Sequence, residues 1–527
     1  MTDYYVDSVN GSDSNDGLTV NSPKATLTQI NALSGDLSGV TIYLGKGSTW
    51  RDQLNFGNNA VYGSAGSRLK ITSYGDGEKP ILNGSDLCAG FVADTTTDSL
   101  GRLYKKTGVT SGQNIFYTGM GGADKRVPMV AWNTNAATTF ATMSEGTASY
   151  DAVNNVIYVW LPSGVSPNGV AEITNRTNAL KIATTNGHVD VSGIHATKAR
   201  DDNISIATIA TSSPTDILVH DNTSDYAGFD DSAVDTSGDG IIVNGDSINR
   251  MTSLYVYNND ISYCMNNAVE FSYVTGAVVY YNRSHDCGGN LCELWADCVN
   301  TKIYRNWAKD HNTKGRLFTA FNEAFAWTAP TASSGGTLTD GTKVIGNVGI
   351  NMRVRSIRHN QGSLDCYNNV FIGCENRGLD CQNIDSPASQ TINFKNNVMG
   401  INDTDFGAFP RAIYLDAAAT NNLDNNLYYI QNPAGDNVKY YNGTSSILWA
   451  GYSAAEPNSN EVSISPFADE QGEDLSLSTG HAMLGAGAIY WGSGSRPQAW
   501  NGELFDTQSP DVGAYQLPGA FYPGKYE

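Results

Sequence analysis

An asparagine recurs at one position of a short repeated segment, and this repeat constrains the fold more than any other feature of the chain. The segments ILVHDN, LYVYNN, AVVYYN, TKIYRN, TKVIGN, LDCYNN, INFKNN and NNLDNN end in Asn222, Asn259, Asn282, Asn306, Asn347, Asn369, Asn397 and Asn426. Successive asparagines are 22 to 41 residues apart, and the shortest intervals are 22 to 24. A period of this length is typical of stacked supersecondary units, with loops inserted where the interval is longer.

Each repeat unit holds two or three short strand patterns and no helical periodicity. The unit therefore predicts one coil of a parallel β-helix, in which equal positions of successive coils stack about 4.8 Å apart. The asparagines would then form a ladder inside a turn, each side-chain amide bonding to its neighbours. The composition agrees with an all-β chain, because charged residues make up only 16% and the polar positions are filled mainly by turn-forming residues.

The 527 residues divide into four parts by pattern. We predict an N-terminal cap and the first coils at residues 1–89, an inserted β subdomain at 90–175, the main β-helix with the functional site at 176–440, and C-terminal coils with a tail at 441–527. Residues 22–33 (SPKATLTQINAL) carry the best helix signal, since Ser22 can cap the helix and Pro23 suits its first turn.

Charge and hydropathy exclude two classes of partner. The formal net charge of −21 would repel nucleic-acid phosphates and anionic membrane surfaces. No run approaches the roughly 18 to 20 apolar residues that span a bilayer, so no membrane insertion is predicted. Residues 1–20 also lack the basic start and apolar core of a signal peptide.

No cofactor is predicted, with Ca²⁺ as the alternative. The turn Asp13-Ser14-Asn15-Asp16-Gly17 resembles the start of a calcium loop but lacks its terminal Glu. The eight cysteines are spread through a long chain, which does not indicate a disulfide framework, and no His pairs accompany them to complete a zinc site.

Segments that follow the ladder asparagines place a second column on the surface of the coils. Their alignment gives an apolar register that should face inward at Ile242, Val269, Cys292, Leu317, Ile357, Leu379 and Ile413. Because side chains alternate along a strand, the next register should face outward. That register holds Val243, Glu270, Glu293, Phe318, Arg358, Asp380 and Tyr414.

Glu270 and Glu293 are the leading candidates for catalysis. They would lie on neighbouring coils of one face, about one strand spacing apart. Two carboxyl groups this close repel each other, which raises one pKa and separates a general acid from a base or nucleophile. Asp297 follows on the same strand as Glu293 and is predicted to assist, while Arg358 would neutralise an acidic group of the substrate.

The residues around this pair complete a predicted sugar-binding groove. Trp295 would point the same way as Glu293, where the apolar face of a sugar ring can stack on it. Carboxylate, amide and guanidinium groups would bond to the sugar hydroxyls. The predicted substrate-binding set is Trp295, Asp380, His359, Tyr273, His311 and Arg316.

Several segments outside the repeat resemble a known group of proteins. The opening YYVDSVNGSDSNDG, then GSTWRDQL and ITSYGDGEKPIL, and the closing LSLSTGHAMLGAGA and SPDVGAYQ are similar to the first and last parts of right-handed parallel β-helix proteins. This group includes phage tailspike depolymerases and bacterial polysaccharide lyases and hydrolases. The resemblance implies a right-handed parallel β-helix that acts on a long, often acidic, extracellular polysaccharide held in a groove.

The resemblance leaves three activities open. VRSIRHNQGSLDCYNNVF is similar to the Arg-His segment of alginate and chondroitin lyases, which would make Arg358 the catalytic acid of a β-elimination. That family also needs a Lys base, and the matching stretch ELWADCVN has none. A carboxylate pair without the lysine favours hydrolysis. A non-catalytic spike or adhesin that binds glycan through the same face is the third reading.

The resemblance also implies a setting. A phage tailspike without a signal sequence would act on capsular, O-antigen or other acidic polysaccharide. We therefore expect an extracellular or virion location and a homotrimer.

Overall fold

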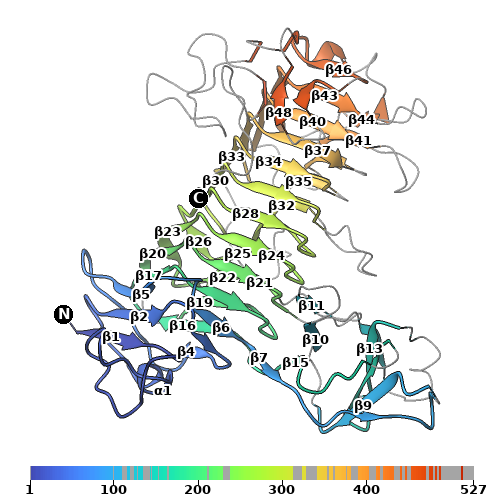
Figure 1. Ribbon diagram of the computed structural model, residues 1–527. Coiled ribbons are helices and arrows are strands. Elements are labelled where there is room, and N and C mark those ends of the chain that lie inside the picture. The colour runs from blue at the N-terminus through green and yellow to red at the C-terminus, as the bar shows by residue number, and fades with distance from the viewer. Residues whose placement is uncertain are drawn as a thin grey trace.

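Three long parallel β-sheets, stacked coil upon coil, form most of the computed structural model (Figure 1). The structure describes residues 2–98, 100–109, 115–118, 124–126, 129–133, 143, 145–151, 153–162, 165–209, 213–228, 238–311, 323–327, 341–352, 355–359, 362–374, 377–381, 390–402, 411–415, 419–431, 439–441, 446–447, 453–463, 465–469, 474–478, 481–483, 486–487 and 512–513. Within these residues, no helix has the length and apolar character needed to cross a membrane.

Each sheet takes one strand from almost every coil. Sheet I contains β1 (Asp3–Val6), β2 (Thr41–Gly45), β5 (Leu69–Tyr74), β17 (Gly187–Ser192), β20 (Thr215–His220), β23 (Met251–Tyr257), β27 (Val278–Tyr280), β30 (Lys302–Tyr304), β33 (Thr342–Ile345), β36 (Leu364–Tyr367), β39 (Thr391–Lys395) and β42 (Thr420–Asp424), with β26 (Val274–Thr275) beside β23. Sheet II contains β3 (Thr49–Trp50), β6 (Ile81–Asn83), β18 (His195–Thr197), β21 (Thr223–Asp225), β24 (Asp260–Ser262), β28 (Arg283–His285), β31 (Trp307–Lys309), β34 (Val348–Ile350), β37 (Val370–Cys374), β40 (Val398–Ile401), β43 (Leu427–Ile430) and β46 (Asn460–Val462). Sheet III contains β4 (Leu54–Phe56), β16 (Leu180–Thr184), β19 (Ile204–Thr208), β22 (Ile241–Asn244), β25 (Val269–Ser272), β29 (Cys292–Ala296), β32 (Glu323–Trp327), β35 (Arg355–His359), β38 (Arg377–Cys381), β41 (Arg411–Leu415), β44 (Lys439–Tyr441) and β45 (Ser446–Ile447).

The predicted asparagine ladder lies in the turn between sheets I and II and is continuous from Asn222 to Asn426. Each ladder side chain donates from Nδ2 to the Oδ1 of the next ladder asparagine, at 2.9 to 3.3 Å. The residue before each ladder asparagine has a positive φ of 53° to 68°, which turns the chain sharply into sheet II. All the ladder side chains are buried, so the ladder satisfies polar groups that water cannot reach.

We expect loss of one ladder side chain to destabilise the stack. Asn306 donates to the carbonyls of Val279 and Tyr304 and to Asn347, and its Oδ1 accepts two bonds from Asn282. Asn306→Ala leaves several buried groups unsatisfied and should lower the free energy of unfolding by about 3 kcal/mol. Urea denaturation measures the loss.

Asn422→Ala is the matched control for this substitution. Asn422 is also an amide on a strand of the stack, but its side chain is exposed. The control should change the free energy of unfolding by less than about 0.5 kcal/mol. Equal losses in the two variants would show that the ladder does not contribute more than a surface amide.

The core of the stack is the apolar interior between the three sheets. It is lined by Val, Ile, Leu, Phe and Ala side chains of the inward registers, such as Ile217, Val256 and Phe394. All eight cysteines are buried and free, and seven of them belong to this core. They act as small apolar side chains, and Cys264 and Cys287 are not joined by a disulfide bond.

The helix near the N-terminus is shorter than the sequence predicts. Only α1 (Thr28–Asn31) is helical, and it starts after Leu27 rather than at Ser22. Lys24 instead bonds to the first strand, since its N–H donates to the Tyr5 carbonyl and its own carbonyl accepts from the Asp7 N–H. The Asp13 carboxylate accepts the N–H groups of the two residues that follow Lys24, so these backbone groups are not available to a helix.

The strands from residue 85 to residue 174 form two smaller sheets outside the stack. One contains β7 (Ser85–Leu87), β10 (Ile115–Thr118), β11 (Asp124–Arg126) and β15 (Ala171–Thr174), and the other contains β8 (Val92–Ala93), β9 (Leu103–Thr107), β12 (Met129–Asn133), β13 (Thr147–Asp151) and β14 (Val156–Trp160). These strands project from the N-terminal end of the stack (Figure 1). Pairing is mostly antiparallel. The exact boundaries of the four predicted parts stay a prediction. Near the C-terminus, η3 (Ser453–Ala455), β47 (Phe467–Asp469) and β48 (Asp474–Leu477) complete the described elements.

A buried ion pair joins these smaller sheets to the stack. Glu172 on β15 accepts from Lys198 Nζ at 2.9 Å and from Arg51 Nη2 at 2.8 Å. Glu172 and Lys198 are 6% and 3% exposed. Phe116 of β10 also packs edge-on against Tyr226 of the stack at a centroid distance of 5.6 Å. The junction therefore combines charge and aromatic packing.

Candidate active site

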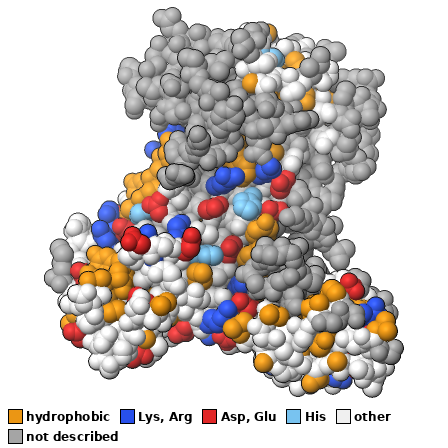
Figure 2. All heavy atoms as spheres, in the orientation of Figure 1, with side chains coloured by type: hydrophobic (Ala, Val, Ile, Leu, Met, Phe, Trp, Pro, Cys, Tyr) orange, Lys and Arg blue, Asp and Glu red, His pale blue; other side chains and the backbone are white. Residues whose placement is uncertain are grey.

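Two glutamates occupy neighbouring positions on the outward face of sheet III, as the sequence predicts. Glu270 of β25 is the register partner of Glu293 of β29. The outward column continues through Ile242, Glu270, Glu293, Ala326, Arg358, Asp380 and Tyr414. Figure 2 shows acidic, basic and His side chains gathered over the middle of the stack.

The predicted phase of β22 is wrong. Val243, predicted to face outward, is buried in the core, and Ile242, predicted to face inward, is the register partner of Glu270. The segment contains three consecutive apolar residues, so alternation could not show which of them faces outward. Phe318 lies outside the described residues, and the register partner of Glu293 on β32 is Ala326.

A single buried amide connects the two glutamates. Asn267 Nδ2 donates to Glu270 Oε2 at 3.0 Å and to Glu293 Oε2 at 2.7 Å. Asn290 Nδ2 lies 3.3 Å from the same Glu293 oxygen. Because the two carboxylate oxygens share one donor atom, they lie within about 6 Å of each other, near the short carboxylate separation of retaining glycosidases.

Asn267 and Asn290 belong to a second ladder that the sequence analysis missed. It lies two residues before the inward position of each sheet III strand and contains Asn178, Asp202, Asp239, Asn267 and Asn290. The backbone N–H of each of the last three donates to the Oδ1 below it, at 2.8 to 3.1 Å. An Asn or Asp two residues before an aliphatic residue or Cys is the signal that could have revealed it.

The surroundings of Glu270 favour its protonated form. Burial, followed by the charges of Glu293 and Asp202, raises the pKa of Glu270 from 4.5 to about 8. Asp239 is fully buried in the second ladder, and burial together with the charge of Glu270 raises its pKa well above the ordinary value. Glu293 is 7% exposed and accepts two amide N–H groups. The pair therefore places a carboxyl group with a raised pKa beside a second, amide-bonded carboxyl group.

We expect Glu270 to make the protein less stable as the pH rises. The folded state holds the Glu270 proton more tightly than the unfolded state, so its stabilising contribution is complete below about pH 4.5 and is lost as the pH rises through about 8. The loss should be of the order of 3 to 5 kcal/mol. Urea denaturation at pH 5, 7 and 9 measures it, with Glu270→Gln as the comparison.

The glutamine variant should lose less stability over the same pH range, because its side chain never ionises. Most other groups titrate alike in both proteins, so the difference between the two pH profiles reports Glu270 together with Asp239, whose pKa depends on the charge of Glu270. Identical profiles would contradict the raised pKa.

A β-bulge places Trp295 beside the glutamates. Phe271 pairs with Leu294, but the next residue of β25, Ser272, pairs with Ala296. Trp295 is the extra residue, and it is 48% exposed. Bulges of this kind re-aim a side chain at the edge of a site. An exposed aromatic ring therefore stands two residues from Glu293.

Asp297 forms an ion pair with an arginine of an earlier coil. Its carboxylate forms an ion pair with Arg250, whose Nη1 also donates to the Asp297 carbonyl at 2.9 Å. Asp297 is 3% exposed and has a positive φ of 51°. This contact ties the end of β29 to the segment that precedes β23.

Positive charge gathers further along the same face. Asp380 is 2% exposed and pairs with Arg355 Nε at 2.9 Å and with Arg377 Nη1 at 2.7 Å. Arg358 is the register partner of Asp380 and is partly buried. Among the described side chains, three arginines are thus found near one carboxylate, in a chain whose net charge is −21.

Two predicted histidines are buried and bonded to neighbouring groups of the chain. His311 is buried, and its ring nitrogens bond to Ser284 and to the Gly289 carbonyl. Burial lowers the pKa of His311 to about 4. His359 is also buried, and its Nε2 bonds to the Gly362 carbonyl.

Of two further predicted residues, the structure describes only one. Tyr273 is partly buried directly after β25, and its N–H donates to the Ala296 carbonyl at 2.6 Å. Arg316 lies outside the described residues.

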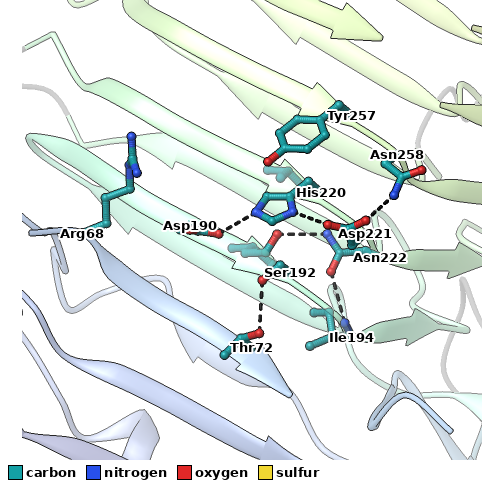
Figure 3. Close-up of polar contacts among 12 residues, drawn as sticks. Arg68, Thr72, Asp190, Ser192, Ile194, His220, Asp221, Asn222, Tyr257 and Asn258 are labelled. Atoms are coloured by element: carbon teal, nitrogen blue, oxygen red, sulfur yellow. Dashed lines mark hydrogen bonds and ion pairs between the residues drawn. The ribbon is translucent and has the colours of Figure 1, made fainter. Parts of the chain in front are cut away.

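A separate polar cluster lies on sheet I (Figure 3). His220 Nε2 bonds to Asp190 at 3.0 Å and its Nδ1 bonds to Asp221 at 2.6 Å. Although burial lowers it, these two carboxylates raise the pKa of His220. The ring stacks on Tyr257 at a centroid distance of 4.6 Å. Both ring nitrogens are engaged, which indicates a structural role.

The described part of the chain contains no group of three or more His, Cys, Asp or Glu side chains placed to hold a metal. In the turn that resembles a calcium loop, Asp13 accepts from Ala25 and Thr26, and Asp16 accepts from Leu18 and Ser22. Ca²⁺ binding therefore remains a prediction from the sequence.

One stretch of the chain is similar in sequence to part of a known enzyme. No protein-family model matches the chain. A stretch of 85 residues is 38% identical to the lacto-N-biosidase of Bifidobacterium longum subsp. longum, and this match covers 15% of the chain and 5% of that enzyme.

Similar solved structures cover far more of the chain. Pectate lyase Pel9A matches 98% of it and 96% of its own length at 11% identity, with a TM-score of 0.49. XylC in complex with xylose matches 84% and 86% at 12% identity, with a TM-score of 0.47. The GH136 lacto-N-biosidase from Eubacterium ramulus matches 84% and 66% at 12% identity, with a TM-score of 0.44. The stacked parallel sheets of the chain form a parallel β-helix, as predicted.

Proposed function

We propose that this protein is a polysaccharide-degrading enzyme that hydrolyses glycosidic bonds with Glu270 and Glu293. The observation that carries the proposal is the pair of carboxyl groups on neighbouring strands, joined through Asn267 Nδ2. Their environments differ, since the pKa of Glu270 is raised to about 8 while Glu293 accepts hydrogen bonds from two amides. Two carboxyl groups with separated protonation states are the minimum that glycoside hydrolysis requires.

The short separation favours a double displacement. Glu293 would attack the anomeric carbon as the nucleophile, while Glu270 gives its proton to the departing glycosidic oxygen. Glu270, now ionised, would then take a proton from a water molecule that breaks the glycosyl ester. The proton returns to Glu270, Glu293 is released as a carboxylate, and the product keeps its anomeric configuration.

Neighbouring residues supply binding rather than chemistry in this proposal. The exposed ring of Trp295 would stack on a sugar beside the cleaved bond. Arg358 lies two strands beyond Glu293, about 10 Å along the stack. It would face an acidic group of the polymer. A capsular, O-antigen or other acidic polysaccharide is therefore the proposed substrate, and the phage-tail setting and the trimer stay predictions from the sequence.

A polysaccharide panel tests the proposal. The protein is incubated with bacterial capsular, O-antigen and algal polysaccharides while polymer size and near-ultraviolet absorbance are followed. We expect one polymer to shorten without new absorbance, and the first product to keep its anomeric configuration by NMR. Shortening with new absorbance would mean β-elimination and would favour Arg358. Binding without shortening would favour a glycan-binding spike.

A further inference from the structure

The second ladder contains one side chain that does more than link coils. Asn267 is fully buried. Its Oδ1 accepts from the backbone N–H of Asn290 at 2.9 Å and from Asn290 Nδ2 at 2.8 Å, as a ladder requires. Its Nδ2 carries two hydrogens, and both are directed to carboxylates, one to Glu270 and one to Glu293. The side-chain oxygen of Asn267 therefore makes the ladder contacts, and its nitrogen makes the contacts with the two glutamates.

The rest of the column shows what the ladder itself needs. Asp202 and Asp239 occupy the same register position, and each accepts the N–H of the next coil through a carboxyl oxygen. An oxygen acceptor is therefore sufficient for the ladder, and the amide nitrogen is not required at every step. The ladder therefore does not explain why position 267 carries an amide nitrogen.

We propose that Asn267 is a positioning residue that holds the general acid and the nucleophile at their working separation. This inference rests on the proposed function. Its two N–H groups fix one oxygen of each glutamate, and Glu270 also shares a hydrogen bond with Asp239. Without it, the two side chains on adjacent strands would no longer be held at one separation, and the reaction depends strongly on such distances.

Asn290 contributes less to the same arrangement. Its Nδ2 lies 3.3 Å from Glu293 Oε2 and also donates to Asn267. Asn178 lies at the other end of the column, and its Nδ2 donates only to the Asp202 carbonyl in the contacts described. One column therefore offers three asparagines with graded contact to the catalytic pair.

The test is the same substitution at these three positions. Asn267→Asp, Asn290→Asp and Asn178→Asp each keep an oxygen acceptor for the ladder and remove an amide donor. The substrate is the polymer that the wild-type protein shortens. We expect kcat to fall at least 100-fold in N267D and less than 10-fold in N290D. We expect no more than a 2-fold change in N178D, with KM within about 3-fold of wild type throughout.

The pH profile separates positioning from a general loss of structure. The Asn267 hydrogen bond favours the ionised form of Glu270, so its removal should move the alkaline limb of kcat/KM to higher pH in N267D. The N178D profile should match wild type. If N267D does not fold, Asn267→Ser takes its place: it replaces the two amide donors with one shorter hydroxyl that cannot bond to both glutamates at once, adds no charge, and should give the same loss of kcat.

The outcomes distinguish this inference from the proposed function. If Glu293→Gln is inactive but N267D keeps the activity and pH profile of N178D, the positioning role is overturned and the catalytic pair stands. If Glu293→Gln retains full activity, the proposed function fails, and the role of Asn267 fails with it.

Discussion

Replacement of Glu293 by Gln is expected to lower kcat/KM on the polymer that the wild type shortens by about 10⁴-fold. The glutamine keeps the size of the side chain and an acceptor for Asn267, but it cannot form the glycosyl ester. KM should change little, because the carboxylate acts on the reacting carbon rather than on the bound chain. The rate of polymer shortening by size-exclusion chromatography measures the loss.

Glu270→Gln should give a different pattern of loss. Activity on the polymer should fall by about 10²- to 10⁴-fold, because the departing oxygen no longer receives a proton. An aryl glycoside of the same sugar, whose leaving group needs little protonation, should lose much less. Asp260→Asn is the control for both variants, because this carboxylate is exposed on sheet II. Equal loss for both substrates in both variants would contradict the separate roles.

The second large effect is expected at the junction with the smaller sheets. Glu172→Gln removes the negative charge that faces the buried Lys198 ammonium group. Removal of one partner of a buried ion pair costs about 3 to 5 kcal/mol, since the remaining charge is poorly solvated. Urea denaturation at pH 7 should show this loss.

An exposed ion pair at the same junction provides the control. Asp86 bonds to Arg176 at 2.5 Å, but its side chain is 40% exposed. Asp86→Asn should therefore cost no more than about 1 kcal/mol. Similar losses in the two variants would show that burial of the Glu172 pair does not set its contribution.

The pH dependence of the wild type gives an independent check on Glu172. Although burial raises it, hydrogen bonding from Arg51 and the charge of Lys198 lower the pKa of Glu172 to about 2. Its contribution is therefore present above pH 4.5 and is lost as the pH falls toward 2. E172Q should lose less stability than the wild type over that range.

The fold could be predicted from the sequence because one residue type marks each coil. The ladder asparagines are needed at a fixed place, since only a side chain with both a donor and an acceptor can bond above and below. Their spacing therefore revealed the coil even where loops are long. The helix at residues 22–33 could not be judged in the same way, because its backbone groups bond to Tyr5, Asp7 and Asp13, far from it in sequence.

The candidate site could be predicted only in part, for two physical reasons. In β25 and β29, charged and apolar residues alternate, so the sequence showed which side chains face outward. In β22 they do not alternate, so the sequence could not show it. Asp239 and Asn267 precede their strands, in turns for which no alternation rule holds. Their burial and their contact with the glutamates depend on coils that come from separate parts of the sequence.

The stacked coils also make the backbone geometry of the site independent of loop length. The backbone positions of Glu270 and Glu293 are one strand spacing apart, a distance that every coil of the stack shares. The connections between β21 and β22 and between β31 and β32 are long, yet the strands on either side of them keep this spacing. The frame on which the proposed catalytic pair stands is therefore a property of the backbone repeat.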